Sequence, residues 1–300
     1  MERYNKLNNY LKEKFGERTL KICIDAGFTC PNRDGTKSYG GCIFCGERGA
    51  GEHLKRINIS EQVTNHLNSY RGQRANKFIA YFQNFTNTYA PVDILKKRYD
   101  SALIDKRIVG IQVATRPDCI NEEIVKLLAS YKPNYYVCVE LGLQTSNDET
   151  GKLLNRQYTS LDFIHAVSLL NKYNIDVITH IMVGLPNETF DDVKNTVDFV
   201  NSLNIQGLKI HSTYVTKDTY LYNMYVSGKY IPLTLEEYLN SLTYILTHVN
   251  PNIVIHRISG DAPKDILVAP SWNSHKKLVL NGIEKILKEQ NLYQGIYFNK

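Results

Sequence analysis

Three cysteines near the N-terminus have the residue type and the spacing of a metal site. Eleven residues separate Cys30 from Cys42, and two residues separate Cys42 from Cys45. Thiolates bind soft metals and iron–sulfur clusters, and a four-iron cluster normally takes four of them. Three thiolates leave one iron open to another ligand. The spacing therefore predicts a site that binds and transforms a ligand, in addition to holding a fold together.

A closed zinc site is the alternative interpretation, because Cys23 lies seven positions before Cys30 and would supply a fourth thiolate. Structural zinc sites usually present two close pairs, and here only Cys42 and Cys45 form one. Cys23 also falls within an apolar run, where a free cysteine commonly packs as a small hydrophobic residue. The cysteines alone favour the open cluster and leave zinc as the second hypothesis.

The composition is that of an ordinary globular chain with a modest positive charge. Hydrophobic residues make up 43% and charged residues 22% of the 300 residues, and the formal net charge is +6. This charge is compatible with an RNA partner and equally with a solvated surface. No stretch approaches the roughly 20 consecutive apolar residues of a membrane helix, and the N-terminus lacks an apolar signal segment. We expect a cytoplasmic protein without membrane contact, whose clustered cysteines bind metal instead of forming disulfides.

Short apolar runs alternate with amphipathic stretches along most of the chain, which predicts an α/β fold. Six strand–helix units in series predict parallel strands with right-handed crossovers, too few for a closed eight-stranded barrel. We therefore expect a partial, open TIM-like (βα)6 barrel. The predicted strands are 20–26, 77–83, 107–114, 135–143, 175–183 and 206–215, and the predicted helices are 60–70, 92–104, 121–130, 161–173 and 190–203.

Three segments follow from this pattern. A basic helical extension at 1–18 precedes the barrel core at 19–216, which includes the cysteine loop after the first strand. Beyond residue 216 the alternation loosens, and we expect 217–300 to form an α/β extension packed on the core as an appended layer. Its predicted elements are helices at 235–250 and 274–290 and a strand at 253–258.

Polar side chains gather just after the predicted strands, where barrels of this kind carry their chemistry. Gln83, Thr86 and Asn87 follow the second run, although asparagine and threonine are also good turn formers. Glu140 and Gln144 alternate along the fourth strand, which puts both on one face, towards the interior. Uncompensated polar groups there would be costly, so these side chains predict a polar ligand.

Other strand ends carry further candidates. Thr115–Asp118, which reads Thr-Arg-Pro-Asp, is a sequence that favours a turn whatever its function. A lone histidine on an apolar strand is more often a core residue than a ligand. Because His180 lies near a strand end, a core role and a ligand role are equally compatible with its position. Lys209, His211 and Tyr214 on the sixth strand are expected to face the substrate cavity or its rim.

The cysteine loop and the strand ends together resemble the radical S-adenosylmethionine (radical SAM) superfamily. There, three cysteines bind a [4Fe-4S] cluster and the methionine part of S-adenosylmethionine chelates the fourth iron. The resemblance thus assigns Cys30, Cys42 and Cys45 to the cluster, and Phe44 to the place of an aromatic residue that packs near the adenine. The eleven-residue gap and Thr115–Asp118 resemble the branch that contains the radical domain of the elongator catalytic subunit.

The resemblance covers almost the whole chain, and residues 25–35, 255–261 and 267–272 are similar to a bacterial elongator-like subgroup. In the coproporphyrinogen-oxidase branch, the residues that match Gln144 and Arg156 contact the cofactor. Gln112 falls where that branch has a ribose-binding glutamate, and His180 where it has an aspartate. The cofactor-binding residues implied are Phe44, Gln83, Thr86, Asn87, Gln112, Glu140, Gln144, Arg156, His180 and Gly184.

The resemblance implies a one-electron reaction, in which the reduced cluster cleaves S-adenosylmethionine to a 5′-deoxyadenosyl radical that abstracts hydrogen from the substrate. The elongator relatives act on the wobble uridine of tRNA. The leading hypothesis is removal of the carboxymethyl group from 5-carboxymethylaminomethyluridine. Expected partners are the anticodon arm of tRNA, a flavodoxin- or ferredoxin-type electron donor and a tRNA methyltransferase. The basic residues expected to hold the anticodon arm are Arg3, Lys6, Lys12 and Lys14.

Two other functions stay open. One is a radical SAM enzyme for a small molecule or a peptide. The other is a non-catalytic protein that uses its cluster or a zinc ion as a structural or redox-sensing element.

Overall fold

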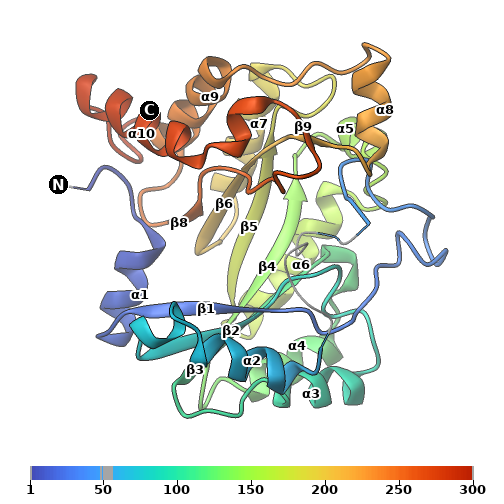
Figure 1. The fold of residues 1–300 in the computed structure, drawn as a ribbon, viewed down its shortest axis with the longest axis vertical. Helices are drawn as coiled ribbons and strands as arrows, with labels where there is room; N and C mark the ends of the chain where they lie inside the picture. The colour runs from blue at the N-terminus through green and yellow to red at the C-terminus, as the bar shows by residue number, and fades with distance from the viewer. Residues whose placement is uncertain (1, 48, 50–56, 299–300) are drawn as a thin grey trace.

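A computed structural model of the chain describes residues 2–47, 49 and 57–298. Within them, seven parallel strands form one sheet that curls into an open barrel (Figure 1), and they follow one another across the sheet in chain order. The predicted partial barrel is confirmed. Its strands are β1 (Thr19–Ile24), β2 (Lys77–Phe82), β3 (Ile108–Thr115), β4 (Tyr136–Gln144), β5 (Asp176–Val183), β6 (Gly207–Ser212) and β8 (Val254–Arg257), and a short antiparallel pair comprises β7 (Val215–Thr216) and β9 (Leu267–Ala269).

Side chains alternate along the strands between a packed outer face and a polar interior. On β1, Ile22 and Ile24 are fully buried in the core that the sheet shares with the helices. Lys21 and Cys23 lie between them in sequence and line the inside of the barrel instead. Lys209 on β6 also lines the inside of the barrel, although its two neighbours in sequence are buried apolar residues. The hydrophobic core therefore lies outside the barrel wall, and polar chemistry lies within it.

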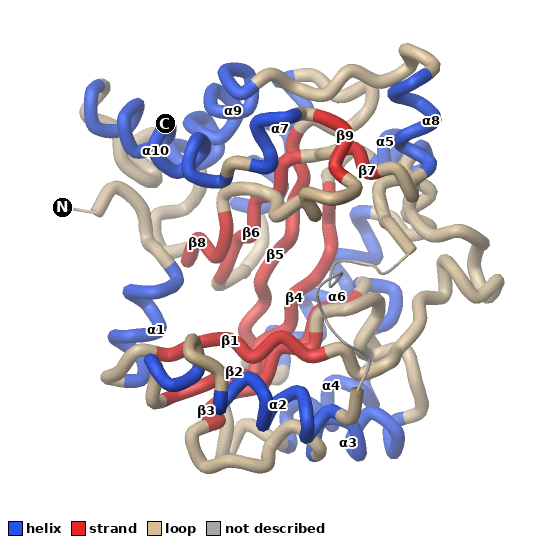
Figure 2. The backbone as a smooth tube through the Cα atoms, viewed as in Figure 1, coloured by secondary structure: helices blue, strands red, loops and turns tan. Residues whose placement is uncertain are grey.

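Helices cover the outer face of the curled sheet (Figure 2). Three of them begin at capping boxes, formed by Thr159 with Asp162, by Thr189 with Asp192 and by Thr234 with Glu237. None of the described helices is long and apolar enough to cross a membrane. The helices are α1 (Leu7–Phe15), α2 (Ile59–Asn68), α3 (Val92–Asp100), α4 (Glu122–Ser130), α5 (Asp148–Leu153), α6 (Ser160–Lys172), α7 (Phe190–Asn201), α8 (Tyr220–Val226), α9 (Leu235–His248) and α10 (Lys276–Glu289), with short 3-10 turns at Gly72–Arg74, Pro117–Cys119 and Ser271–Ser274.

The C-terminal segment contributes a strand to the barrel itself. β8 pairs in parallel with β6, and Lys209 lies opposite Arg257 in the register. The two helices between these strands, α8 and α9, form the crossover that returns the chain parallel to β6. The sequence predicted this strand but placed it in an appended layer. The structure instead makes it the seventh strand of the wall.

An N-terminal strap, residues 3–15, spans the gap between the two edge strands of the open barrel, β1 and β8 (Figure 1). The Ile255 amide on β8 donates to the Asn5 carbonyl at 2.7 Å, which satisfies an edge that would otherwise be unpaired. At the other end of the strap, the Lys77 ammonium donates to the Phe15 carbonyl at 2.7 Å. The strap therefore closes the side of the barrel without adding a strand to the sheet.

Candidate active site

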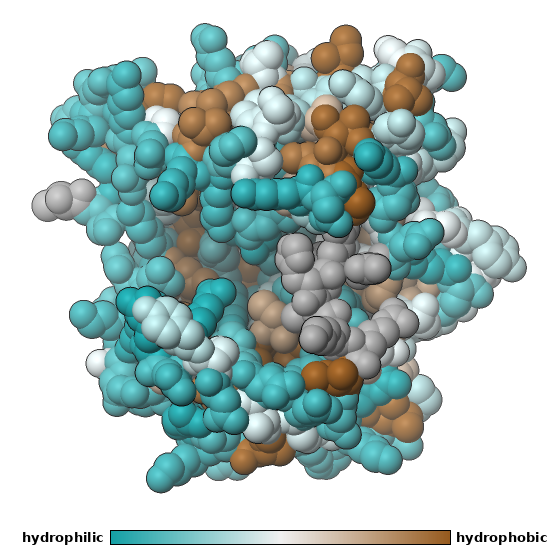
Figure 3. Space-filling model, viewed as in Figure 1, coloured by the Kyte–Doolittle hydropathy of each residue, from teal (hydrophilic) through white to brown (hydrophobic). Residues whose placement is uncertain are grey.

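The interior of the open barrel is a cavity of about 1140 Å³. Residues of the cysteine loop, of the inward strand faces and of the N-terminal strap all line it. On the face shown in Figure 3, the surface is hollowed between β1 and the C-terminal segments, and the rim is mainly hydrophilic. Most single small-molecule sites occupy ~300–1,000 Å³. This cavity therefore has room for a cofactor and a second ligand.

The cysteine loop, residues 25–46, is held in place by hydrogen bonds to its own backbone and to the loop after α5. The Asn32 amide donates to the Asn155 carbonyl at 2.5 Å and lies 3.6 Å from the sulfur of Cys42. The Arg33 guanidinium donates to the Cys45 carbonyl at 2.6 Å. These contacts fix where the sulfur atoms stand.

Cys30, Cys42 and Cys45 line the cavity as free thiols. Burial, together with the nearby Cys45 and Cys30, raises the pKa of Cys42 to about 12. A bound metal group would remove this penalty, because thiolates bind it deprotonated. Among the described residues, no three His, Cys, Asp or Glu side chains meet closely enough for a single metal ion. A four-iron cluster is larger than one ion, so the three sulfurs fit such a cluster better than a closed zinc site.

Arg116 connects the cysteine loop to the end of β3. Its guanidinium binds both carboxylate oxygens of Asp118, at 2.9 and 2.8 Å, and donates to the Arg156 carbonyl at 3.0 Å. Its third nitrogen lies 4.0 Å from the sulfur of Cys30. Donors directed at cluster sulfurs are a recognised means of tuning such sites. The Thr115–Asp118 segment therefore forms the turn after β3 and also places the Arg116 cation beside the expected cluster.

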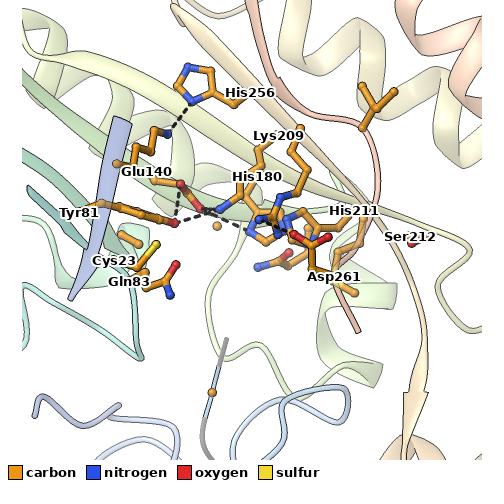
Figure 4. Close-up of a pocket in the computed structure, with 18 of the residues that line it drawn as sticks. Cys23, Tyr81, Gln83, Glu140, His180, Lys209, His211, Ser212, His256 and Asp261 are labelled. Carbon is orange, nitrogen blue, oxygen red and sulfur yellow. Dashed lines mark hydrogen bonds and ion pairs between the residues drawn. The ribbon is translucent and has the colours of Figure 1, made fainter. Parts of the chain in front are cut away.

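Glu140 is the centre of a buried polar network further inside the barrel (Figure 4). Tyr81 and Gln112 each donate to one carboxylate oxygen at 2.9 Å, and the Lys209 ammonium donates to the other at 2.6 Å. Burial opposes ionisation of Glu140, but the charge of Lys209 holds its pKa well below the usual range. Glu140 and Lys209 are thus an ion pair at neutral pH.

Two histidines with tilted rings lie in contact beside this network. The rings of His180 and His211 have centroids 4.0 Å apart. Burial and the Lys209 charge lower the pKa of His180 to about 3, and burial also lowers that of His211. The Nε2 atoms of both rings are buried without a hydrogen-bond partner among the described residues. Neutral, unsatisfied imidazoles facing a cavity are suited to a polar ligand.

The structure brings most of the predicted site residues together. Lys209, His211 and Tyr214 also line the cavity, as expected. Asn87, Gln112, Arg156 and Gly184 are the four predicted residues that do not line it. Those that do are Cys30, Cys42, Cys45, Phe44, Gln83, Thr86, Glu140, Gln144 and His180.

Arg156 lies behind the cavity wall, fully buried. Its guanidinium donates to the carbonyls of Leu143 and Thr145, at 2.6 and 2.7 Å, and to the carboxylate of Asp148 at 2.7 Å. These bonds tie the end of β4 to the helices that follow. The arrangement favours a positioning role for Arg156 over direct contact with a cofactor.

The other three also act on the backbone or on neighbouring side chains. Asn87 donates to the Ala114 carbonyl at 2.9 Å and braces the turn after β2. Gln112 orients Glu140. Gly184 has a φ of +82°, and a Cβ there would lie 2.9 Å from Leu233, so glycine is required at this turn.

Gln144 occupies a strained position at the end of β4. Its φ is +68°, which is rare for a residue with a side chain, and the pairing of β4 with β5 shifts beside it. Its Oε1 atom is buried without a partner among the described residues. Strain of this kind persists where function requires it, which supports the predicted ligand role.

Sequence reasoning did not select four lining residues, Lys21, Tyr81, Arg116 and His256, as site residues. Arg116 lies within a string that had been singled out, so its signal was present. Lys21 is the one charged residue within β1, between apolar neighbours. Tyr81 occupies an ordinary strand position and carries no local signal, whereas His256 lies within the string 255–261 that resembles the elongator-like subgroup.

Comparison with known proteins places these features in a family. The Radical SAM superfamily model matches residues 29–200, and the model of the Radical_SAM C-terminal domain matches residues 205–289. YtqA of Bacillus subtilis is 38% identical over all of this chain and 94% of its own length. Protein YhcC of Escherichia coli is 32% identical over 96% of this chain and 93% of its own.

A solved structure shares the fold. Archaeal Elp3 from Methanocaldococcus infernus superposes with a TM-score of 0.71 at 19% identity, over 92% of this chain and 64% of that structure. The chain is therefore an enzyme of the radical SAM superfamily, whose members bind a [4Fe-4S] cluster and S-adenosylmethionine.

Proposed function

We propose that this enzyme removes the carboxymethyl group from 5-carboxymethylaminomethyluridine at the wobble position of tRNA. The observation that carries the proposal is the cavity of about 1140 Å³, which extends from the cysteine loop to an ionised interior. The archaeal Elp3 fold and the elongator-like motifs of the sequence support the same substrate class. A modified base turned out of the anticodon loop would enter this cavity beside the cofactor.

The cofactor, when bound, supplies the one-electron chemistry that abstracts a hydrogen atom. Removal of the group balances as a two-electron oxidation. The methylene carbon would lose one hydrogen atom to the deoxyadenosyl group and one electron back to the cluster. Water would then hydrolyse the resulting imine to the aminomethyl base and glyoxylate. The residues of this chain hold and orient the reactants. Cys30, Cys42 and Cys45 would bind the cluster, and Gln83 and Thr86 at the end of β2 would bind the polar end of S-adenosylmethionine. These residues all line one cavity.

The residues that would contact RNA differ from the sequence expectation. Arg3 donates to the side chain of Asn291, and Lys6 pairs with Glu2 at 2.7 Å. The Lys14 ammonium lies 4.5 Å from the ring centroid of Tyr136. Most of the basic N-terminal residues therefore bind their own chain. Arg71, which lines the cavity, is better placed to attract RNA phosphates.

The test is conversion of tRNA in vitro. Cluster-loaded protein, a low-potential reductant and S-adenosylmethionine are incubated anaerobically with tRNA from a strain that lacks the gene, and nucleosides are measured by mass spectrometry. We expect 5-carboxymethylaminomethyluridine to fall and 5-aminomethyluridine to rise, with 5′-deoxyadenosine formed in parallel. The Cys42→Ser variant is the control and should do neither.

Two results would contradict the proposal. Formation of 5′-deoxyadenosine with unchanged tRNA would indicate a radical enzyme with a small-molecule or peptide substrate. Absence of 5′-deoxyadenosine from fully loaded protein would indicate a non-catalytic role. A flavodoxin- or ferredoxin-type donor, and a tRNA methyltransferase that uses the aminomethyl product, remain the expected partners.

A further inference from the structure

Lys21 and His256 meet across the opening of the barrel, at the part of the cavity that the N-terminal strap covers. Lys21 belongs to β1 and His256 to β8, the two edge strands of the sheet. The Lys21 ammonium lies 3.3 Å from Nδ1 of His256, and His256 is labelled in Figure 4. Gly207 on β6 leaves room for the ring, because a Cβ there would lie 2.8 Å from Nε2 of His256.

Within the described part of the chain, Lys21 has no carboxylate partner of the kind that Lys209 and Arg257 have. Lys209 pairs with Glu140 at 2.6 Å, and Arg257 pairs with Asp261 at 2.9 Å. Among the residues that the structure describes, no carboxylate lies within ion-pair distance of Lys21. Its other close contact is the ring of Tyr81, whose centroid is 5.2 Å from the ammonium. A partly buried ammonium without an ion-pair partner is costly, and such a group is characteristic of a binding site.

The Lys21–His256 pair is organised to accept an anion. Burial, and then the Lys21 charge, lower the pKa of His256 well below its ordinary value, so the imidazole is neutral. Its Nδ1 atom accepts a hydrogen bond from Lys21 and orients the ammonium. The remaining ammonium protons are available to a ligand. A single ammonium without an ion-pair partner suits a carboxylate better than a phosphate, which carries nearly two negative charges and is favoured by arginine forks.

The Lys21 ammonium and the nearby Glu140 carboxylate together complement a ligand group that carries one negative and one positive charge, as an amino acid does. Tyr81 lies between the two charges, with its ring against Lys21 and its hydroxyl 2.9 Å from Glu140. A carboxymethylamino group carries a secondary ammonium one carbon away from a carboxylate. Its ammonium would face Glu140 while its carboxylate would face Lys21.

We infer that Lys21, oriented by His256, binds the carboxylate of the substrate's carboxymethylamino group and selects it over the bare aminomethyl group. This inference rests on the proposed tRNA function. It makes Lys21 a specificity-determining residue and His256 a positioning residue.

The experiment compares two anticodon stem-loop RNAs that differ only at the wobble base, one with 5-carboxymethylaminomethyluridine and one with 5-aminomethyluridine. Their Kd values are measured anaerobically, at one salt concentration, with cluster-loaded protein. The wild type should prefer the carboxylated RNA by about 10- to 100-fold, the range of a charge-assisted hydrogen bond. Lys21→Met should bind both RNAs equally. Lys126→Met, which removes an exposed lysine on α4, should behave like the wild type.

A second measurement separates this inference from the tRNA proposal. N-methylglycine carries the same ammonium and carboxylate without RNA, and its effect on Tm is measured for each protein. Stabilisation of the wild type but not of Lys21→Met would support the carboxylate site even if tRNA were not converted. A Lys21→Met protein with native iron content that still prefers the carboxylated RNA would overturn the inference, even if the wild type converted tRNA. Equal Tm shifts in wild type and Lys21→Met would also overturn it.

Discussion

Replacing Lys21 by methionine should stabilise the protein in the absence of substrate. Burial lowers the pKa of Lys21 from 10.5 to about 8, because the folded protein disfavours its charged form. One pKa unit corresponds to about 1.4 kcal/mol, so the charged lysine costs the folded state about 3 kcal/mol. Methionine has nearly the same length and no charge. We expect the free energy of unfolding of Lys21→Met to exceed that of the wild type by about 1–3 kcal/mol at pH 7.

The difference in stability between Lys21→Met and the wild type depends on pH. Between pH 8 and 10.5, the unfolded chain keeps the Lys21 proton while the folded protein has lost it. The unfolded state therefore binds more protons, and the wild type gains stability relative to the variant as pH rises through this window. The advantage of Lys21→Met is complete below pH 8 and fades towards pH 10.5. The groups that face Lys21 are present in both proteins, and they are Glu140 and Cys138 on β4, Lys209 on β6, Cys23 on β1, Tyr81 on β2 and His256 on β8.

Anaerobic urea unfolding of both proteins at pH 7 and pH 9.5, at equal iron content, measures the difference directly. A variant that is less stable than the wild type at pH 7 would show that the Lys21 charge is compensated in the folded protein. A stability difference that is the same at both pH values would show that another property of the side chain is responsible.

Three further predictions concern the cluster and the wall of the barrel. Cys42→Ser should lose most of its iron while Cys23→Ser keeps it, as measured by iron content and absorbance, and the reverse pattern would reassign the ligands. Arg116→Lys should lower the free energy of unfolding by about 1–3 kcal/mol, because lysine cannot reproduce the two-pronged pairing with Asp118; an unchanged urea midpoint would show that this geometry is dispensable. Burial raises the pKa of Glu188 to about 7, so the wild type loses stability as pH rises from 4.5 to 7, and Glu188→Gln should be more stable than the wild type at pH 8 but not at pH 4.5. Lower stability of that variant at pH 8 would mean that the ionised carboxylate is required.

The sequence predicted the elements well because the local pattern is strong. β2 was expected at 77–83 and lies at Lys77–Phe82, and α6 was expected at 161–173 and lies at Ser160–Lys172. Period-two burial and helix caps are local signals, so a single chain carries them. The place of β8 was missed because membership of a sheet depends on partners far away in sequence.

The site residues that belong to a local sequence motif were predictable. Those that meet only because distant strands lie side by side in the fold were not. Cys30, Cys42 and Cys45 form a recognisable spacing, and all three line the cavity. Lys21 and His256 are 235 positions apart, and nothing near either residue indicates that they meet. Alternation along a strand predicts that a side chain points inwards, but it does not predict which other inward side chain it contacts.

The N-terminal strap has a consequence for the order in which the molecule is built. Arg3 contacts Asn291, 288 positions away, and Asn5 pairs with Ile255 on the last strand of the sheet. Contacts of such separation form slowly, and chains fold from the N-terminus during synthesis. The cysteine loop and the first six strands can therefore form while the side of the barrel beside β1 is still uncovered. The inward-facing sulfur atoms stay accessible from that side until the ribosome has released β8 and α10.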